Sequence, residues 1–296
     1  KMKHDTLAAG LLLFVMASSG CKKIIDEIIK KPNGIATDCR IEKITTNAYG
    51  LTPDHQEIIV PDTAYISYNA AGNPTRIRHT VNSNPLLAQD PYYKVPPVGS
   101  IFKYDAQNRL IAYLEGYERD TVYKLDKTYT WRVFKYTGFN KVTAITYNIG
   151  TASYGAGDDY NSIKNEPDSH EGIWDANSGV YTLDAFGRIT KRKWLDGSHQ
   201  QTYSYDASGN KVGGNYTDKI NYRQTNKVWM FLNNDYSVNM KSPPYDYYIN
   251  DDSPNAFNSK KMPTGFDWFP RIVPSYYYFI GDYATNGPIV MHYECK

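Results

Sequence analysis

The sequence predicts an all-β protein, and three observations support this prediction. Tyr accounts for 28 of the 296 residues and aromatic residues for 15%, and these side chains suit half-buried pleated surfaces. Segments such as Thr128 to Tyr136 and Lys141 to Tyr147 alternate β-branched or aromatic residues with polar ones. One turn pattern recurs six times among such segments. We therefore expect an extended, twisted antiparallel sheet of hairpins, preceded by an N-terminal signal and tether helix.

The first 20 residues are expected to be an export signal. Lys1 and Lys3 are positively charged, and the apolar run from Leu7 to Met16 is too short to span a bilayer, which needs about 20 residues. Small residues then lead to Cys21, an ending that resembles the lipobox of bacterial lipoproteins, although Ser18 stands where Leu is usual. The resemblance implies a diacylglycerol-modified Cys21 and an envelope protein anchored to the outer membrane, either periplasmic or surface-exposed. An ordinary secretory signal with an incidental Cys is the alternative.

Residues 21–38 are expected to form a tether behind the lipid. Ile24, Ile25, Ile28 and Ile29 share one face at helical spacing, and Pro32 ends the pattern. A short amphipathic helix and a flexible tether with locally packed isoleucines both fit, because an isolated helix of about ten residues is marginal in water.

Residues 39–296 are long enough to bury a core and are interpreted as a single β domain. Cys39 and Cys295 stand at its two ends. Export to an oxidising environment favours a bridge between them over two free thiols. The bridge would contribute on the order of 5 kcal/mol in the chain-entropy model. It would also place the first and last strands side by side, where they would cover or pair the otherwise exposed edge of the sheet.

The recurring turn lies between about residues 60 and 232. Its pattern is a Tyr or Leu that ends a strand, usually Asp or Asn next, two variable residues, Gly or Asn, and a basic or amide residue. An Asp or Asn side chain at the first turn position accepts hydrogen bonds from backbone amides two residues on. Gly or Asn at the fourth position tolerates the left-handed conformation that joins twisted strands. The residues expected there are Gly72, Asn108, Asn140, Gly187, Gly209 and Asn226.

These turns resemble the tyrosine-aspartate (YD, or RHS-like) repeat. Together with the lipobox, they make the chain similar to Bacteroidota surface lipoproteins of unknown function that carry degenerate YD-like repeats. The resemblance covers about residues 39 to 232, with an insertion from Ile149 to Val180. Because the spacing is uneven, it implies a divergent array and not the toxin-enclosing shells of long RHS proteins.

Beyond Leu232 the chain becomes rich in Tyr and Pro. It ends with an expected hairpin, Ser275 to Tyr283 and Ile289 to Glu294, around an Asn-Gly pair. No helix longer than a few turns is required anywhere after Lys31.

Motifs for common catalytic, metal and cofactor sites are absent from the sequence, so we expect no catalytic residues and no cofactor. The net charge of +2, from 33 basic and 31 acidic residues that are interspersed, argues against a nucleic-acid partner. Two acidic pairs, Asp158 with Asp159 and Asp251 with Asp252, are candidates for Ca²⁺, and solvated turns are the alternative because neither follows the EF-hand spacing.

Aromatic side chains are the other candidates for ligand binding. Trp174, Trp268, Tyr245 and Tyr248 lie in turn-rich or Tyr-rich segments and could stack on sugars or a protein partner. The tryptophans of strand-like segments are expected in the core; they are Trp131, Trp194 and Trp229.

The leading hypothesis is a non-catalytic, lipid-anchored cell-envelope protein whose sheet is a binding or structural module. The membrane, through the lipid, and a glycan or protein ligand are its expected partners. The alternative is a carbohydrate-active enzyme or a glycan-binding lipoprotein. An enzyme of that class would need two carboxylates close together beside an exposed Trp.

Overall fold

A computed structural model describes residues 38–54, 56–80, 99–119, 124–148, 172–173, 178–242, 254–266 and 288–295. They form the predicted all-β fold, with one antiparallel sheet of 14 strands and a separate two-stranded ribbon. The strands in the first half of the chain are β1 (Cys39–Leu51), β2 (Glu57–Tyr68), β3 (Pro74–His79), β4 (Gly99–Tyr104), β5 (Leu110–Arg119), β6 (Lys124–Thr137) and β7 (Lys141–Asn148). The later strands are β8 (Gly172–Ile173), β9 (Gly179–Leu183), β10 (Ile189–Trp194), β11 (Gln200–Thr202), β12 (Tyr216–Ile220), β13 (Asn239–Lys241), β14 (Pro254–Phe257), β15 (Pro263–Phe266) and β16 (Ile289–Cys295).

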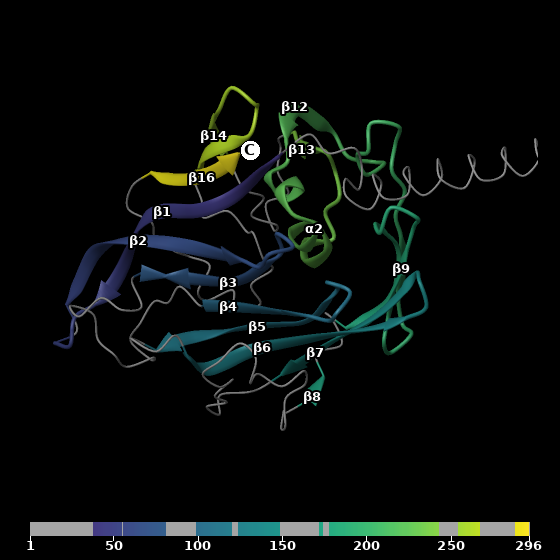
Figure 1. Ribbon diagram of the computed structural model, residues 1–296, viewed down its shortest axis with the longest axis horizontal. Coiled ribbons are helices and arrows are strands. Elements are labelled where there is room, and N and C mark those ends of the chain that lie inside the picture. The colour runs from purple at the N-terminus through teal and green to yellow at the C-terminus, as the bar shows by residue number, and fades with distance from the viewer. Residues whose placement is uncertain are drawn as a thin grey trace, which may run out of the picture.

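The large sheet is mostly a meander in chain order. Its spatial order is β11-β10-β9-β7-β6-β5-β4-β3-β2-β1-β16-β15-β14, with β8 also paired to β7, and β12 pairs with β13 in the ribbon. The strand β16 returns to lie beside β1 (Figure 1), with β15 on its other side. The two ends of the β domain therefore lie side by side, as predicted, and β16 pairs the side of β1 that β2 leaves open. β15 and β14 then extend the sheet beyond β16, so this pair of strands lies inside the sheet and not at its edge.

Cys39 and Cys295 form the predicted disulfide. The two residues are opposite each other in the β1–β16 register, and their Cα atoms are 3.9 Å apart. The bridge joins positions separated by 256 residues, so it closes nearly the whole domain.

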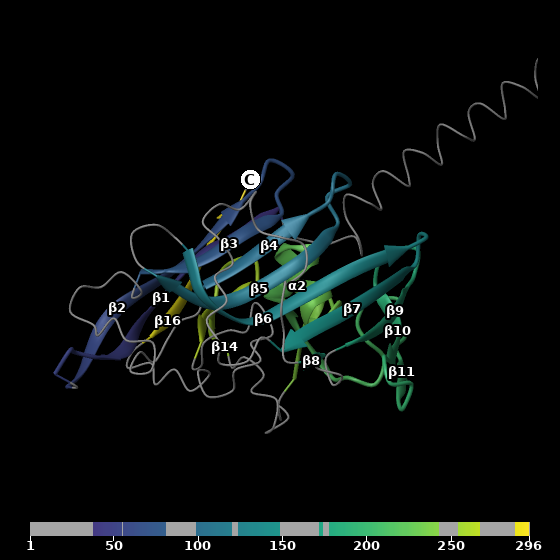
Figure 2. The same cartoon turned by 90° about the horizontal axis from the view of Figure 1, so that it is seen from below.

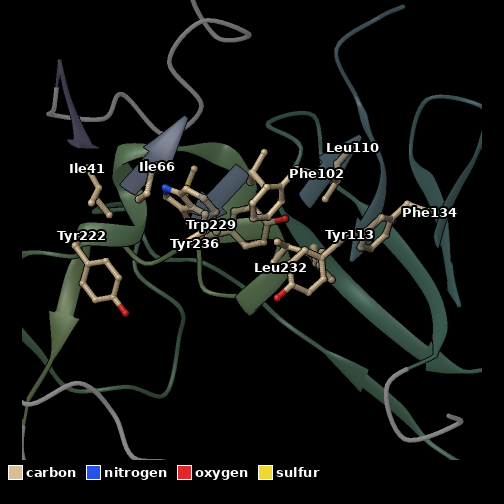
Figure 3. Close-up of a cluster of buried hydrophobic side chains, with 14 of the residues drawn as sticks. Ile41, Ile66, Phe102, Leu110, Tyr113, Phe134, Tyr222, Trp229, Leu232 and Tyr236 are labelled. Atoms are coloured by element: carbon tan, nitrogen blue, oxygen red, sulfur yellow. The ribbon is translucent and has the colours of Figure 1, made fainter. Parts of the chain in front are cut away.

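The sheet curves around a short helical segment, as Figure 1 and Figure 2 show. This segment contains the 3-10 helix η5 (Tyr222–Thr225) and the helix α2 (Lys227–Asn233). The Trp229 ring of α2 meets Phe102 of β4 at a centroid distance of 5.4 Å, and Phe231 meets Phe134 of β6 at 5.2 Å. Figure 3 shows the cluster that these contacts belong to, which is the main core.

Within the described residues, no helix is both long and apolar enough to cross a membrane.

Alternate residues of β4 to β7 build a second cluster on the opposite face of the sheet. Because strand side chains alternate between faces, Phe102 and Tyr113 face α2, whereas Ile101 and Leu114 belong to the second cluster. Trp131 is buried in this second cluster, as predicted. Trp194 is only half-buried, so its prediction as a core residue is wrong; it ends β10 near the edge of the sheet, where less chain packs against it.

Two of the six predicted turn positions are wrong. Asn226 has an extended φ of −155° and caps α2, accepting a hydrogen bond from the Val228 amide at 2.9 Å. The apolar residues after it are buried against the sheet as a helix, and a helix start favours Asn as its cap. In the β6–β7 turn the left-handed residue is Gly138, with a φ of 67°, and not Asn140. Gly adopts this conformation at lower cost than Asn.

Candidate functional site

Four of the predicted turns share one hydrogen-bond pattern, which we call the recurrent turn. They span residues 69–73, 105–109, 184–188 and 206–210. Their fourth residues, Gly72, Asn108, Gly187 and Gly209, have φ between 58° and 83°, as predicted. In each turn the side-chain oxygen of the first residue accepts a hydrogen bond from the amide of the fifth, at 2.8 to 3.0 Å.

A further recurrent turn, residues 258–262, was missed in the sequence. Asn258 Oδ1 accepts hydrogen bonds from the amides of Lys260 and Met262. The fourth residue is Lys261, whose φ is 61°. Sequence reasoning missed this turn because it required Gly or Asn at that position. The Asn at the first position was the signal that could have found it.

Tyrosines link neighbouring hairpins at the end of the sheet where these turns lie. Each donates its hydroxyl to a backbone carbonyl of the adjacent hairpin, at 2.6 to 3.0 Å: Tyr68 to Ile41, Tyr104 to Pro74, Tyr136 to Leu110, Tyr205 to Ile189, and Tyr293 to Pro263. All but one of these acceptors directly follow a recurrent turn. Burial raises the pKa of Tyr68, Tyr136, Tyr205 and Tyr293, so their hydroxyls stay protonated and donate. The strand-ending Tyr therefore has a physical role, because it buries a ring and pairs the hydroxyl.

The remaining acceptor, Ile41, follows no turn, but its surroundings repeat the same pattern. Arg40 Nε donates to Glu294 Oε2 at 2.7 Å, and the Arg40 guanidinium lies 4.9 Å from the centre of the Tyr68 ring. At residues 105–109, Arg109 likewise donates to Asp105 at 2.7 Å and lies over Tyr136 at 4.5 Å.

Arg188 repeats these contacts with Asp184 and Tyr205, at 2.7 Å and 4.2 Å. The two ends of the β domain thus form one hairpin unit, with Tyr293 and Glu294 on β16 and Arg40 and Ile41 on β1. The Cys39–Cys295 disulfide takes the place of the turn. We call this unit the divided hairpin.

A pocket of about 390 Å³, here called the turn pocket, opens between these turns and α2. Turns 105–109, 138–140 and 184–188 contribute to its wall, together with the first residues of α2. Most of the lining is apolar; its larger side chains include Tyr136, Leu183, Met230, Phe231 and Tyr236. Phe139 and Phe186 also line the pocket, and Phe139 is fully exposed while Phe186 is 43% exposed. Exposed rings beside an apolar pocket are typical of a binding site.

Three charged residues line the turn pocket, Arg109, Asp184 and Lys227, and the first two are ion-paired with Asp105 and Arg188 beside the pocket. Burial raises the pKa of Asp105, but hydrogen bonds and charge from Arg109 outweigh burial and hold that pKa below its usual value. Asp184 is ion-paired with Arg188 at 2.7 Å. The Lys227 side chain reaches solvent, yet the protein around its ammonium group lowers its pKa by desolvation, opposed by the charge of Asp105.

Sequence reasoning did not select Phe139, Phe186 or Lys227. A signal was present for the two phenylalanines, because each precedes the Gly or Asn of a predicted turn, where an exposed aromatic residue is unexpected. For Lys227 there was none, since its place at the pocket follows from the position of α2.

The described residues offer few arrangements suited to catalysis. Asp62, which lies 2.6 Å from His79 Nδ1, and Glu115 are buried on β2 and β5. Two strands separate β2 from β5, so about 14 Å lies between them, beyond the spacing of paired carboxylates in glycosidases. No three His, Cys, Asp or Glu side chains within the described ranges gather closely enough to hold a metal ion.

The other predicted site residues lie outside the described residues. They are the lipidation residue Cys21, the aromatics Trp174, Trp268, Tyr245 and Tyr248, and the acidic residues Asp158, Asp159, Asp251 and Asp252.

Comparison with known proteins adds no assignment. No protein-family model matches the chain, and no curated protein matches its sequence.

Proposed function

We propose that this protein is a non-catalytic, lipid-anchored binding protein of the cell envelope, and that its β domain binds a ligand in the turn pocket. The pocket itself carries the proposal. It is concave, mostly apolar and provided with a few charged groups, as ligand sites usually are. Its wall is built from several hairpins and a helix that pack on one core, so the site is held by a rigid scaffold.

The binding test uses Nile red, an uncharged dye whose fluorescence rises in apolar surroundings. Ala185 is exposed and lines the pocket at the second position of its turn, so Ala185→Trp should obstruct the pocket without altering the core. Ala207 holds the same position in turn 206–210, is exposed, and does not line the pocket. We expect dye binding by the wild type and by Ala207→Trp, and at least a tenfold loss of affinity in Ala185→Trp. Equal binding by both variants would place the dye elsewhere and refute the pocket as the site.

The anchor is tested by fatty-acid labelling in an exporting bacterial cell. The apolar run and small residues before Cys21 support lipidation of that residue. Labelled palmitate should enter the wild type, and Cys21→Ser should remain unlabelled and be either unprocessed or soluble. Equal labelling of the two proteins would end this part of the proposal.

A glycan is the second candidate ligand, and the exposed rings of Phe139 and Phe186 favour it. Aromatic side chains supply flat apolar faces that suit the stacking of sugar rings. A glycan array probed with the wild type and with Phe139→Ala tests this candidate. Binding that does not depend on Phe139 would argue against a glycan in the turn pocket.

A further inference from the structure

The charges around the turn pocket do not balance. Three charged residues line it: Arg109, Asp184 and Lys227. Arg109 is paired with Asp105 and Asp184 with Arg188, and neither partner lines the pocket. The local excess is therefore one positive charge, which we assign to Lys227.

Both carboxylates are occupied by their own turns. Asp105 accepts from the Arg109 side chain at 2.7 Å and from the amides of Gln107 and Arg109. Asp184 accepts in the same way from the Arg188 side chain and from the amides of Phe186 and Arg188. These oxygens are held in the turns and are poorly placed to receive a cationic ligand.

Lys227 differs from the two arginines. It lines the pocket but makes no ion pair with any residue in the described part of the chain. An ammonium group that is partly shielded from water interacts more strongly with an opposite charge than one in bulk solvent. The pocket thus combines an apolar wall with one cation available at its side.

We infer that the turn pocket binds an anionic amphiphile: a small molecule with an aromatic or aliphatic body and one acidic group. The body would lie against the apolar wall that includes Tyr136 and Phe231, and the acidic group would pair with the Lys227 ammonium. This inference rests on the proposed binding function and specifies the ligand class. A cationic ligand of the same shape would be repelled by the excess positive charge and would bind more weakly.

Three probes of similar shape and different charge test the inference: 3-phenylpropionate, 3-phenylpropanamide and 3-phenylpropylamine. Affinities are measured by calorimetry or protein-observed NMR. For the wild type we expect the acid to bind about three to ten times more tightly than the amide, and the amine to bind most weakly. Lys227→Met should remove the advantage of the acid, and Lys227→Glu should make the amine the preferred probe.

Lys141→Met is the matched control. Lys141 is exposed, follows turn 138–140 and does not line the pocket, so this variant changes the net charge equally and should keep the wild-type order. A circular dichroism melt of each variant checks that it is folded. If a variant does not fold, the order of the three probe affinities for the wild type still tests the inference. Equal affinities for acid and amide would overturn the inference, as would Nile red binding without binding of any of the three probes. Loss of pocket-dependent Nile red binding would instead refute the proposed function.

Discussion

At the scale of single residues, the fourth position of the recurrent turn is set by backbone conformation. Gly187 has a φ of 78°, and a Cβ added there would meet nothing within 4 Å. The cost of a side chain is therefore conformational and not steric. Gly187→Val should lower the free energy of unfolding by about 1 to 3 kcal/mol, measured by urea denaturation followed by Trp fluorescence.

Lys261 supplies the reverse experiment. It has a φ of 61° although it carries a side chain. Lys261→Gly should relieve that strain and raise the free energy of unfolding by a few tenths to about 1 kcal/mol. An exposed ion pair with Asp218 is lost in this variant, so Lys261→Met, which loses the pair and keeps the side chain, is the reference. If glycine is no more stable than methionine there, the conformational argument fails for this turn.

Tyr293 provides the prediction for the inter-hairpin hydrogen bonds. Its hydroxyl donates to the Pro263 carbonyl at 2.6 Å. Tyr293→Phe keeps the ring and leaves this buried carbonyl without its donor, so unfolding should become easier by about 0.5 to 1.5 kcal/mol. Tyr65→Phe is the control, because that ring is 47% exposed, and its effect should be within about 0.5 kcal/mol of zero. Similar losses of unfolding free energy at both positions would show that the Tyr293 hydrogen bond does not stabilise the fold.

Residue-scale prediction from the sequence succeeded where local chemistry decides the conformation. Gly72, Asn108, Gly187 and Gly209 were identified because a positive φ leaves few residue types at low cost. The requirement for Gly or Asn at the fourth position failed at Lys261. There the Asn258 side chain and the flanking strands hold a lysine at positive φ, a conformation that lysine rarely adopts.

At the scale of elements, α2 depends on its cap. The Asn226 side chain accepts from the Val228 amide at 2.9 Å, and its own amide group donates to the Gly72 carbonyl at 2.8 Å. Asn226→Ala should lower the free energy of unfolding by about 0.5 to 2 kcal/mol. Asn226→Asp keeps the cap and loses only the contact with Gly72, so it should fall between alanine and the wild type in a urea titration. An aspartate variant as unstable as alanine would show that the cap is not the important contact.

The strands were predictable and α2 was not, for one physical reason. Strands such as β6 and β7 carry a period-two pattern and a turn that joins them, so local sequence specifies both. The run Val228 to Leu232 is apolar at every position, and such a short run fits a buried strand as well as a buried helix. Its packing against the curved face of the sheet decides between them, and that face exists only after distant strands have paired.

At the scale of the whole molecule, the sequence predicted which cysteines pair but not where the pair would lie. Export and cysteine count favoured the bridge, whereas its position inside the sheet depends on β15 and β14 extending beyond β16. Replacing both cysteines, Cys39→Ser with Cys295→Ser, should lower the free energy of unfolding by about 2 to 5 kcal/mol. Reductant should have the same effect on the wild type and none on the variant. A double-serine variant as stable as the oxidised wild type would show that the Cys39–Cys295 disulfide does not stabilise the fold.

The divided hairpin leads to a stronger test, a circular permutant without the disulfide. In the undivided turn 105–109, three residues separate Asp105 from Arg109. A three-residue Ala-Ser-Gly linker from Glu294 to Arg40, in place of residues 1–39 and 295–296, would therefore replace the disulfide by a turn of the same length. New chain ends can be opened between Ser198 and His199, in the exposed connection from β10 to β11.

If the disulfide stands in place of a turn, the permutant should keep the Arg40–Glu294 and Tyr68–Ile41 contacts. Its free energy of unfolding should then lie within about 2 kcal/mol of that of the oxidised wild type. It should also exceed that of the double-serine variant in native order, because the linker restores the closure that this variant lacks. Reductant should leave its unfolding curve unchanged. The native-order protein cleaved between Ser198 and His199, with its two fragments still joined by the Cys39–Cys295 disulfide, controls for the new ends. A permutant that fails to fold while this control folds would mean that the two chain ends merely lie side by side and do not form one hairpin unit.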